Sequence, residues 1–398
     1  MAKVELLAPA GSLEKLYVAI DYGADAVYIG GQEFGLRANA DNFSIPEIKT
    51  ACDYAHNHNA KVYVTVNIIF HDENFEGLDD YLMDLKEAGV DALIVADLYA
   101  IRRCQKVIPE MEIHLSTQQS VINYRSANFF YDQGIERVVL AREANQGEIK
   151  ELVENSKAEV EVFIHGGVCI SYSGRCTLSN HMTARDSNRG GCSQNCRWEF
   201  ELYNKEKNIS EDQVMFSMNP KDLMQVDYVV DMIKNGVVSL KVEGRMRSVH
   251  YIATVISTYR KLIDDYYEYG EDFVYSDYYE SELQKSANRV LAGQYYEGMP
   301  TNNELQYDSR AEHPTQEFIG IIKEVNGDDV VLEQRNFFRP GDLVEVFGPE
   351  IKTTEFIIGD IYDEEGNALD AARHPKQIIK TKIEVELHPK NMLRKVRK

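Results

Sequence analysis

The chain has 398 residues, of which 44% are hydrophobic, and its formal net charge is −22. This length exceeds what one small core needs, and the apolar content excludes a disordered chain. No apolar run approaches the roughly 18 residues that span a bilayer, so we expect a cytoplasmic protein with no membrane contact. The negative charge repels polyanions at long range, so a nucleic acid would have to bind a local basic patch.

The first part of the chain alternates strand-like and helix-like patterns. Eight strands are predicted, at 4–8, 26–30, 61–66, 92–96, 113–116, 137–140, 160–165 and 238–242. Helical patterns lie between them, at 12–22, 45–57, 74–87, 98–108, 120–133 and 143–155. Repeated β-then-α order predicts a parallel sheet with helices outside, and eight strands in roughly 250 residues fit a (β/α)8 TIM-like barrel. A doubly wound sheet is the alternative, but no G-x-G-x-x-G follows the first strand.

The rest of the chain divides into an insertion, further helices and a second domain. An insertion at 199–237 is predicted to hold a hairpin and a helix over 220–235. Helices are also predicted over 249–267 and 280–291, which completes a barrel domain of residues 1–300. A polar linker over 301–314 precedes residues 315–398, where short strands alternate with Asn-Gly and Pro-Gly turns. These turns indicate a small C-terminal β-barrel.

A barrel of this type carries its active site at the C-terminal ends of its strands. Polar residues follow every predicted strand, including Arg142 and Glu143 after the sixth. Among these polar residues we take five as candidate site residues: Arg37 after strand two, His165 at the end of strand seven, and Lys241, Glu243 and Arg245 at strand eight. Together these residues predict a polar cup at one end of the barrel.

Four of the six cysteines lie within residues 161–198, after the seventh strand: Cys169, Cys176, Cys192 and Cys196. Their spacing, C-x6-C-x15-C-x3-C, differs from the paired C-x2-C knuckles of a zinc ribbon. Wide, uneven spacing suits a four-cysteine 4Fe-4S cluster, which is larger than a zinc ion. Structural zinc remains an alternative because thiolates also bind it, and disulfides are less favoured because nothing marks the chain as secreted.

The motif E-x-F-x-H-G-x-x-C-x-x-Y-S-G-x-C, from Glu161 to Cys176, resembles the signature of the U32 peptidase-like family. The resemblance extends from the N-terminal LAPAGS segment to the eighth strand, and the C-terminal β segment resembles that family's C-terminal domain. The chain length and the run SNHMTARDSNRGGCSQNCRW look most like members that hydroxylate the wobble uridine of tRNA to 5-hydroxyuridine in a prephenate-dependent reaction. Other members hydroxylate ribosomal RNA or act in ubiquinone synthesis, and older ones carry a collagenase-like protease label.

The resemblance implies cluster ligands at Cys169, Cys176 and Cys192. Several relatives take the fourth ligand from a Lys-Asp-Leu-Cys step, where this chain has Met224 in place of the cysteine. Cys196 is then the natural fourth ligand, with the thioether of Met224 as a weaker alternative.

The co-substrate that the resemblance implies, prephenate, is a dicarboxylate, which guanidinium groups bind in bidentate pairs. We therefore take Arg37, Arg185, Arg189 and Arg245, together with Lys241, as candidate substrate ligands. Arg185 and Arg189 also belong to the one basic stretch of the cysteine region.

Four further residues are candidates for catalysis or base stacking. His165 could shuttle a proton near neutral pH, or it could be a core histidine. Glu161 and Glu243 are candidate catalytic carboxylates, or partners of neighbouring cations. Tyr172 could stack on an exposed base of the tRNA anticodon loop, although core packing is the commoner fate of a tyrosine.

Three functions follow for comparison: an RNA-modifying redox enzyme, a peptidase, and a non-catalytic iron–sulfur scaffold. A peptidase could use Ser171, Ser173 and His165, but the sequence has no nucleophile elbow and no H-E-x-x-H motif. Cysteines that bind a cluster cannot serve as nucleophiles, which favours the redox enzyme. Whether a partner subunit, paralogous or a second copy, completes the protein is left open.

Overall fold

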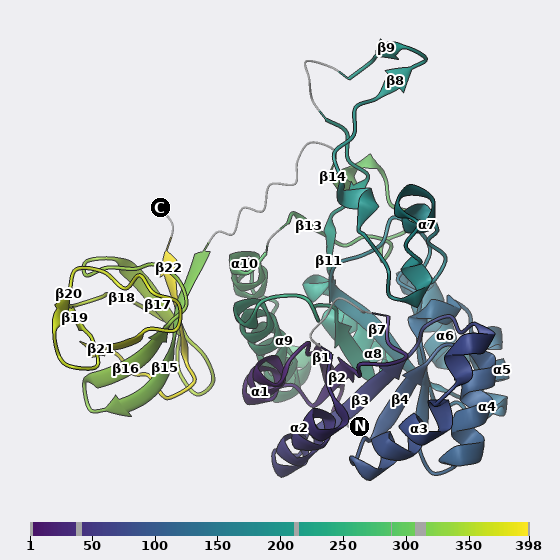
Figure 1. Cartoon of the computed structure of the whole chain (residues 1–398), viewed down its shortest axis with the longest axis horizontal. Helices are drawn as coiled ribbons and strands as arrows, with labels where there is room; N and C mark the ends of the chain where they lie inside the picture. Colours follow the sequence, from purple (N-terminus) through teal and green to yellow (C-terminus); the bar gives the residue numbers. More distant parts are fainter. Residues whose placement is uncertain (1–2, 37–41, 211–214, 288, 307–315, 397–398) are drawn as a thin grey trace.

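The computed structural model describes residues 3–36, 42–210, 215–287, 289–306 and 316–396. Arg37 and residues 307–314 of the predicted linker lie outside these ranges. The chain forms a barrel and a separate β domain at its side (Figure 1). No helix in the described ranges is long and apolar enough to cross a membrane.

Eight parallel strands close the barrel, which confirms the predicted fold class. They are β1 (Glu5–Pro9), β2 (Ala26–Gly30), β3 (Lys61–Val66), β4 (Ala92–Val95), β5 (Glu112–Leu115), β6 (Arg137–Val139), β7 (Glu159–Gly166) and β12 (Ser239–Val242). Strand β12 pairs with both β1 and β7, so the sheet has no open edge at this point. Closure explains the near-continuous apolar strands, because both faces of each strand are covered.

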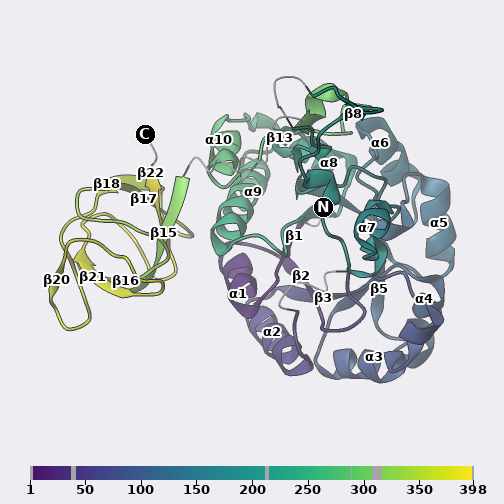
Figure 2. The ribbon, with the colours of Figure 1, turned by 45° about the horizontal axis from the view of Figure 1, so that its top comes forward.

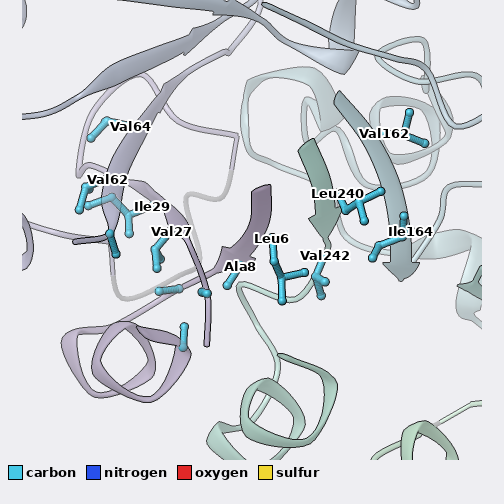
Figure 3. Close-up of a cluster of buried hydrophobic side chains, with 14 of the residues drawn as sticks. Leu6, Ala8, Val27, Ile29, Val62, Val64, Val162, Ile164, Leu240 and Val242 are labelled. Carbon is cyan, nitrogen blue, oxygen red and sulfur yellow. The ribbon is translucent and has the colours of Figure 1, made fainter. Parts of the chain in front are cut away.

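The helices surround this sheet. They are α1 (Leu13–Asp21), α2 (Ile45–Asn57), α3 (Leu78–Glu87), α4 (Leu98–Val107), α5 (Tyr124–Asp132), α6 (Gln146–Asn155), α8 (Val229–Asn235), α9 (Val249–Tyr269) and α10 (Tyr278–Lys285). Alternate strand residues such as Leu6, Val27, Ile29, Leu240 and Val242 belong to the core between strands and helices (Figure 3). The intervening residues fill the barrel interior.

The segment after β7 departs from barrel geometry. A cysteine loop (residues 167–198) carries the short helix α7 (Leu178–Thr183), which lies over the open end of the barrel (Figure 2). The predicted hairpin is present as β8 (Tyr203–Asn204) and β9 (Lys207–Asn208). Strand β10 (Asn219–Pro220) pairs with β14 (Leu305–Gln306), so residues 305–306 of the predicted linker belong to a sheet.

Two predicted helices are wrong in part. Within 220–235 the helix begins only at Val229, because β11 (Asp222–Met224) pairs antiparallel with the end of β7. Within 280–291 the helix ends at Lys285, and β13 (Leu291–Ala292) adds to β11. Both errors arise because pairing with a strand distant in sequence overrides the local helical pattern.

The C-terminal domain is an antiparallel sheet that curls around its own core. Its strands are β15 (Gln316–Asn326), β16 (Asp329–Gln334), β17 (Leu343–Phe347), β18 (Thr354–Ile357), β19 (Ile361–Tyr362), β20 (Ala368–Leu369), β21 (Ile378–Lys382) and β22 (Met392–Val396). Arg394, fully buried, donates to Glu345 beside it and to Glu282 of α10 at 2.6 Å. His250 of α9 stacks on Phe318. These contacts fix the domain to the flank of the barrel.

Candidate functional site

One pocket lies at the C-terminal ends of the barrel strands, beneath the cysteine loop. Its floor is formed by strand residues: Tyr28, Thr65, Ile94, Val139 and Phe163. Its roof comes from the loop and includes all four cysteines: Cys169, Ser171, Tyr172, Ser173, Cys176, Asn188, Cys192 and Cys196. The pocket therefore joins the barrel mouth and the cysteines, which were predicted to meet there.

Two glycines let the loop turn back onto the barrel. Gly166 has φ +108°, and a Cβ there would lie 2.2 Å from the carbonyl oxygen of Glu243. Gly174 has φ +72°, and a Cβ there would lie 2.4 Å from the carbonyl oxygen of Gln118. Only glycine fits such close approaches at positive φ. Between them the loop is tied down, because the Ser173 amide donates to Glu143 at 2.8 Å.

The four loop cysteines share this pocket as thiols. All six cysteines of the chain fall in described ranges, and none is in a disulfide. Burial raises the pKa of the Cys196 thiol, and the three other loop thiols raise it further, whereas Arg197 lowers it. Cys196 therefore lies within electrostatic reach of the three other loop thiols.

The placement of these donors can be compared with what a single metal ion requires. Among the described residues, no three Cys, His, Asp or Glu side chains converge closely enough to hold one metal ion. A structural zinc needs four donors at about 2.3 Å from a single point. The four thiols line one pocket. Met224 pairs with His165 in the sheet and packs on the core, so Cys196 is the fourth thiol at the pocket.

Three cationic side chains line the pocket: Arg142, Lys241 and Arg245. The Arg142 guanidinium lies 3.9 Å from the centre of the Phe163 ring and 3.9 Å from Glu243. Its Nε is buried and has no hydrogen-bond partner among the described residues. Arg245 is buried and donates to Thr65 at 3.3 Å. We did not select Arg142 from the sequence, because only its place after a strand distinguished it from other arginines.

Below the pocket lies a buried ion network. Lys241 Nζ donates to Glu161 at 2.6 Å, and Arg137 lies 3.5 Å from Glu161 and 2.7 Å from Glu5. Burial lowers the pKa of Lys241, although Glu161 opposes this effect. Burial would raise the pKa of Glu161, but Lys241 and Arg137 hold it below its ordinary value. Glu161 thus pairs with cations and does not line the pocket, whereas Glu243 lines it and accepts from Tyr28 at 3.0 Å.

His165 faces away from the pocket. Its Nδ1 lies 3.2 Å from the hydroxyl of Tyr259 on α9, and its ring also packs near Tyr251. Burial lowers the pKa of His165 to about 3. This is the environment of a core histidine, so the pocket does not support the predicted proton shuttle. Ser173 instead contacts Glu143, so the serines and His165 are not brought together as a peptidase site.

The remaining candidates lie at or beyond the rim. Tyr172 lines the pocket and is 57% exposed. Arg189 pairs with Glu73 at 2.8 Å beside the loop after β3, and Arg185 is exposed. Neither arginine lines the pocket. The structure therefore brings together Lys241, Glu243, Arg245, Tyr172 and the cysteines, and it leaves Arg185 and Arg189 outside.

Comparison with known proteins gives two family matches and several relatives. The sequence profile of peptidase family U32 matches residues 11–306, and that of the peptidase family U32 C-terminal domain matches residues 314–394. A Bacillus subtilis protein named tRNA hydroxylation protein P1 is 52% identical over 99% of this chain and 95% of its own length. The 23S rRNA 5-hydroxycytidine C2501 synthase of Escherichia coli is 39% identical over 66% of this chain and 39% of its own length. A Porphyromonas gingivalis protein named collagenase is 31% identical over 74% of this chain and 73% of its own length.

Proposed function

The chain belongs to peptidase family U32, and on this premise we propose that it is an RNA hydroxylase that converts the wobble uridine of tRNA to 5-hydroxyuridine. Relatives named for hydroxylation of tRNA and of rRNA support the general reaction. The observation that carries the proposal is the single pocket in which four thiols face the cationic and polar strand ends of the barrel.

The four thiols would hold a 4Fe-4S cluster. Replacing the C5 hydrogen of uridine by a hydroxyl group adds one oxygen atom and removes two electrons from the base, so prephenate, the one co-substrate of the proposed reaction, would have to accept these two electrons. A bound cluster would supply electron-transfer chemistry for this oxidation. Cys169, Cys176 and Cys192 would be the first three ligands, and Cys196 would be the fourth, since it lines the pocket and Met224 does not.

The cations of the pocket suit prephenate as the co-substrate. Prephenate carries two carboxylates, and a guanidinium can donate two parallel hydrogen bonds to each carboxylate. Arg142 and Arg245 approach the pocket from β6 and β12, and the buried Nε of Arg142 lacks a partner among the described residues. Lys241 also lines the pocket, where its ammonium pairs with Glu161. The two arginines would bind and orient the dicarboxylate.

The target base would enter from the rim. A base must leave its stack before an enzyme can reach its C5 atom, and bases of a single-stranded loop do so most easily. The exposed ring of Tyr172 lies at the pocket and offers a stacking face for such a base. The sheltered pocket would then exclude bulk water from the reacting atoms.

A reaction with purified components tests this proposal. The protein, prepared without oxygen, is incubated with prephenate and tRNA that lacks the modification, and the nucleosides are analysed by mass spectrometry. We expect 5-hydroxyuridine with the wild-type protein and none with Cys196→Ala, which should also lose most of its iron. Met224→Ala is the matched control and should keep both. A wild-type protein that contains iron, makes no 5-hydroxyuridine and cleaves gelatin would favour the collagenase-like activity instead.

A further inference from the structure

The strand ends that line the pocket differ in chemistry. Those of β6 and β12 contribute the charged residues Arg142, Lys241, Glu243 and Arg245, and the Arg245 guanidinium reaches Thr65 of β3. The loops after β3 and β5 contribute neutral hydrogen-bonding groups, among them Asn67, Ser116 and Gln118. A dicarboxylate suits the charged groups, whereas an uncharged base with a polar edge suits the neutral ones.

Asn67 and Ser116 form a defined pair among the neutral groups. Asn67 Nδ2 donates to Ser116 Oγ at 3.3 Å, and the backbone amide of Gln118 donates to the same oxygen at 3.3 Å. Ser116 Oγ thus already accepts two hydrogen bonds, so its own hydroxyl hydrogen can serve as a donor.

The other end of the Asn67 amide is unsatisfied. Its Oδ1 is buried and accepts no hydrogen bond from the residues that the structure describes. A buried carbonyl oxygen without a partner is costly, and in a binding pocket it indicates a donor on the ligand. The pair therefore presents one acceptor, Asn67 Oδ1, beside one donor, the Ser116 hydroxyl.

We propose that Asn67 selects uracil by accepting a hydrogen bond from its N3–H, while Ser116 donates to a neighbouring carbonyl oxygen of the base. This inference rests on the proposed function and identifies the residue that distinguishes its substrate. Uracil presents N3–H between two carbonyl oxygens, which matches an acceptor beside a donor.

Cytosine does not fit this pair in the same position. Its N3 carries a lone pair, which would face the lone pairs of Asn67 Oδ1. Cytosine could form hydrogen bonds with both Asn67 Oδ1 and the Ser116 hydroxyl only if the base shifted sideways in the pocket. That shift would move its C5 atom away from the position that C5 of uracil occupies. A relative is named for a cytidine product, so a base-selecting residue would distinguish members of the family. A site built around a hydrogen bond rejects a base that cannot make it.

The test uses anticodon stem–loops that carry uridine, cytidine or 3-methyluridine at the target position. Binding is measured by fluorescence anisotropy with iron-loaded protein, and hydroxylation is measured by mass spectrometry with prephenate. We expect wild-type protein to bind the 3-methyluridine loop about tenfold more weakly than the uridine loop, because one hydrogen bond is lost. This binding measurement requires no variant of the protein and does not depend on whether hydroxylation occurs.

Two variants test the residue itself. Asn67→Ala should bind the uridine and 3-methyluridine loops equally, and its preference for hydroxylating uridine over cytidine should fall about tenfold. Asn67→Asp keeps an acceptor and should retain the preference. Asn74→Ala, in the same loop after β3, removes an amide whose Oδ1 accepts from the His71 backbone, and it is the matched control.

The outcomes separate the two proposals. If wild-type protein makes 5-hydroxyuridine but Asn67→Ala keeps the full preference for uridine, the role of Asn67 is overturned and the hydroxylase stands. If no 5-hydroxyuridine forms although Asn67→Ala loses the discrimination in binding, the hydroxylase fails and the base-selecting role stands. Equal binding of all three loops by wild-type protein overturns the selection of uracil.

Discussion

Removing the carboxylate of Glu161 should destabilise the barrel more than most single substitutions. Glu161 is 0% exposed, and it lies 2.6 Å from Lys241 Nζ. In Glu161→Ala, Lys241 stays buried without this partner, whereas Arg137 keeps Glu5 at 2.7 Å. Breaking a buried pair by removing one partner costs about 3–5 kcal/mol, because the remaining charge is left in a medium of low dielectric constant.

Urea unfolding followed by circular dichroism measures this loss. Glu161→Ala should lower the free energy of unfolding of the barrel by about 3–5 kcal/mol. Adding Lys241→Met removes the orphaned charge, so the double variant should recover most of the loss. Glu73→Ala breaks the pair of Arg189 with a carboxylate whose side chain is 72% exposed, and it should cost less than about 1 kcal/mol. Equal losses for Glu161→Ala and Glu73→Ala would refute the buried network as a source of stability.

Five further substitutions test the loop, the rim and the domain interface. Gly166→Ala places a Cβ 2.2 Å from a carbonyl oxygen at positive φ, so the cysteine loop should shift and the iron content per chain should fall severalfold. Tyr172→Ala should weaken binding of an anticodon stem–loop about tenfold, measured by anisotropy, because a stacking face is lost. Arg185→Gln should reduce the slope of log affinity against log salt by about 0.7, and Arg189→Gln by less, because Arg189 already pairs with a carboxylate. Burial and a nearby arginine lower the pKa of His250 to about 3, so unfolding takes up a proton between pH 6.5 and 3 and stability falls as the pH falls through that range. His250→Leu should therefore lose less stability than wild type between pH 7.5 and 5.5, by about 1 kcal/mol, measured by urea unfolding.

The barrel was predictable because its signal is local and repeated. The predicted bounds of β2, β3 and α2 agree with the structure to the residue. A parallel strand that is buried on both faces has a continuous run of apolar residues in the sequence. In a helix that covers such a strand, the apolar residues recur with a period of 3.6 residues. The error over residues 220–235 came from β11, whose pairing with β7 joins segments more than 50 positions apart.

The site was predicted only in part because side-chain direction depends on register. Strict alternation along β7 would put His165 on the same face as Glu161 and Phe163, inside the barrel. The pairing of β7 with β12 instead shifts between Phe163 and His165, and the extra residue turns His165 outward onto α9. A β-bulge of this kind has no signature in a single sequence, and it reverses the face of every following side chain.

The charge of −22 constrains how an RNA hydroxylase of this kind could choose its substrate. Neutralisation of backbone phosphates by lysine and arginine contributes to the binding of every nucleic acid, whatever its sequence. An acidic chain gains little binding free energy from this contribution. The pocket cations do not change this balance much, because Lys241 pairs with Glu161 and Arg142 lies near Glu243. Affinity would then depend on contacts that only an unstacked base can make, such as the Tyr172 ring and the Asn67 amide. Weak attraction to the backbone therefore favours selection of one exposed base over tight binding to any RNA.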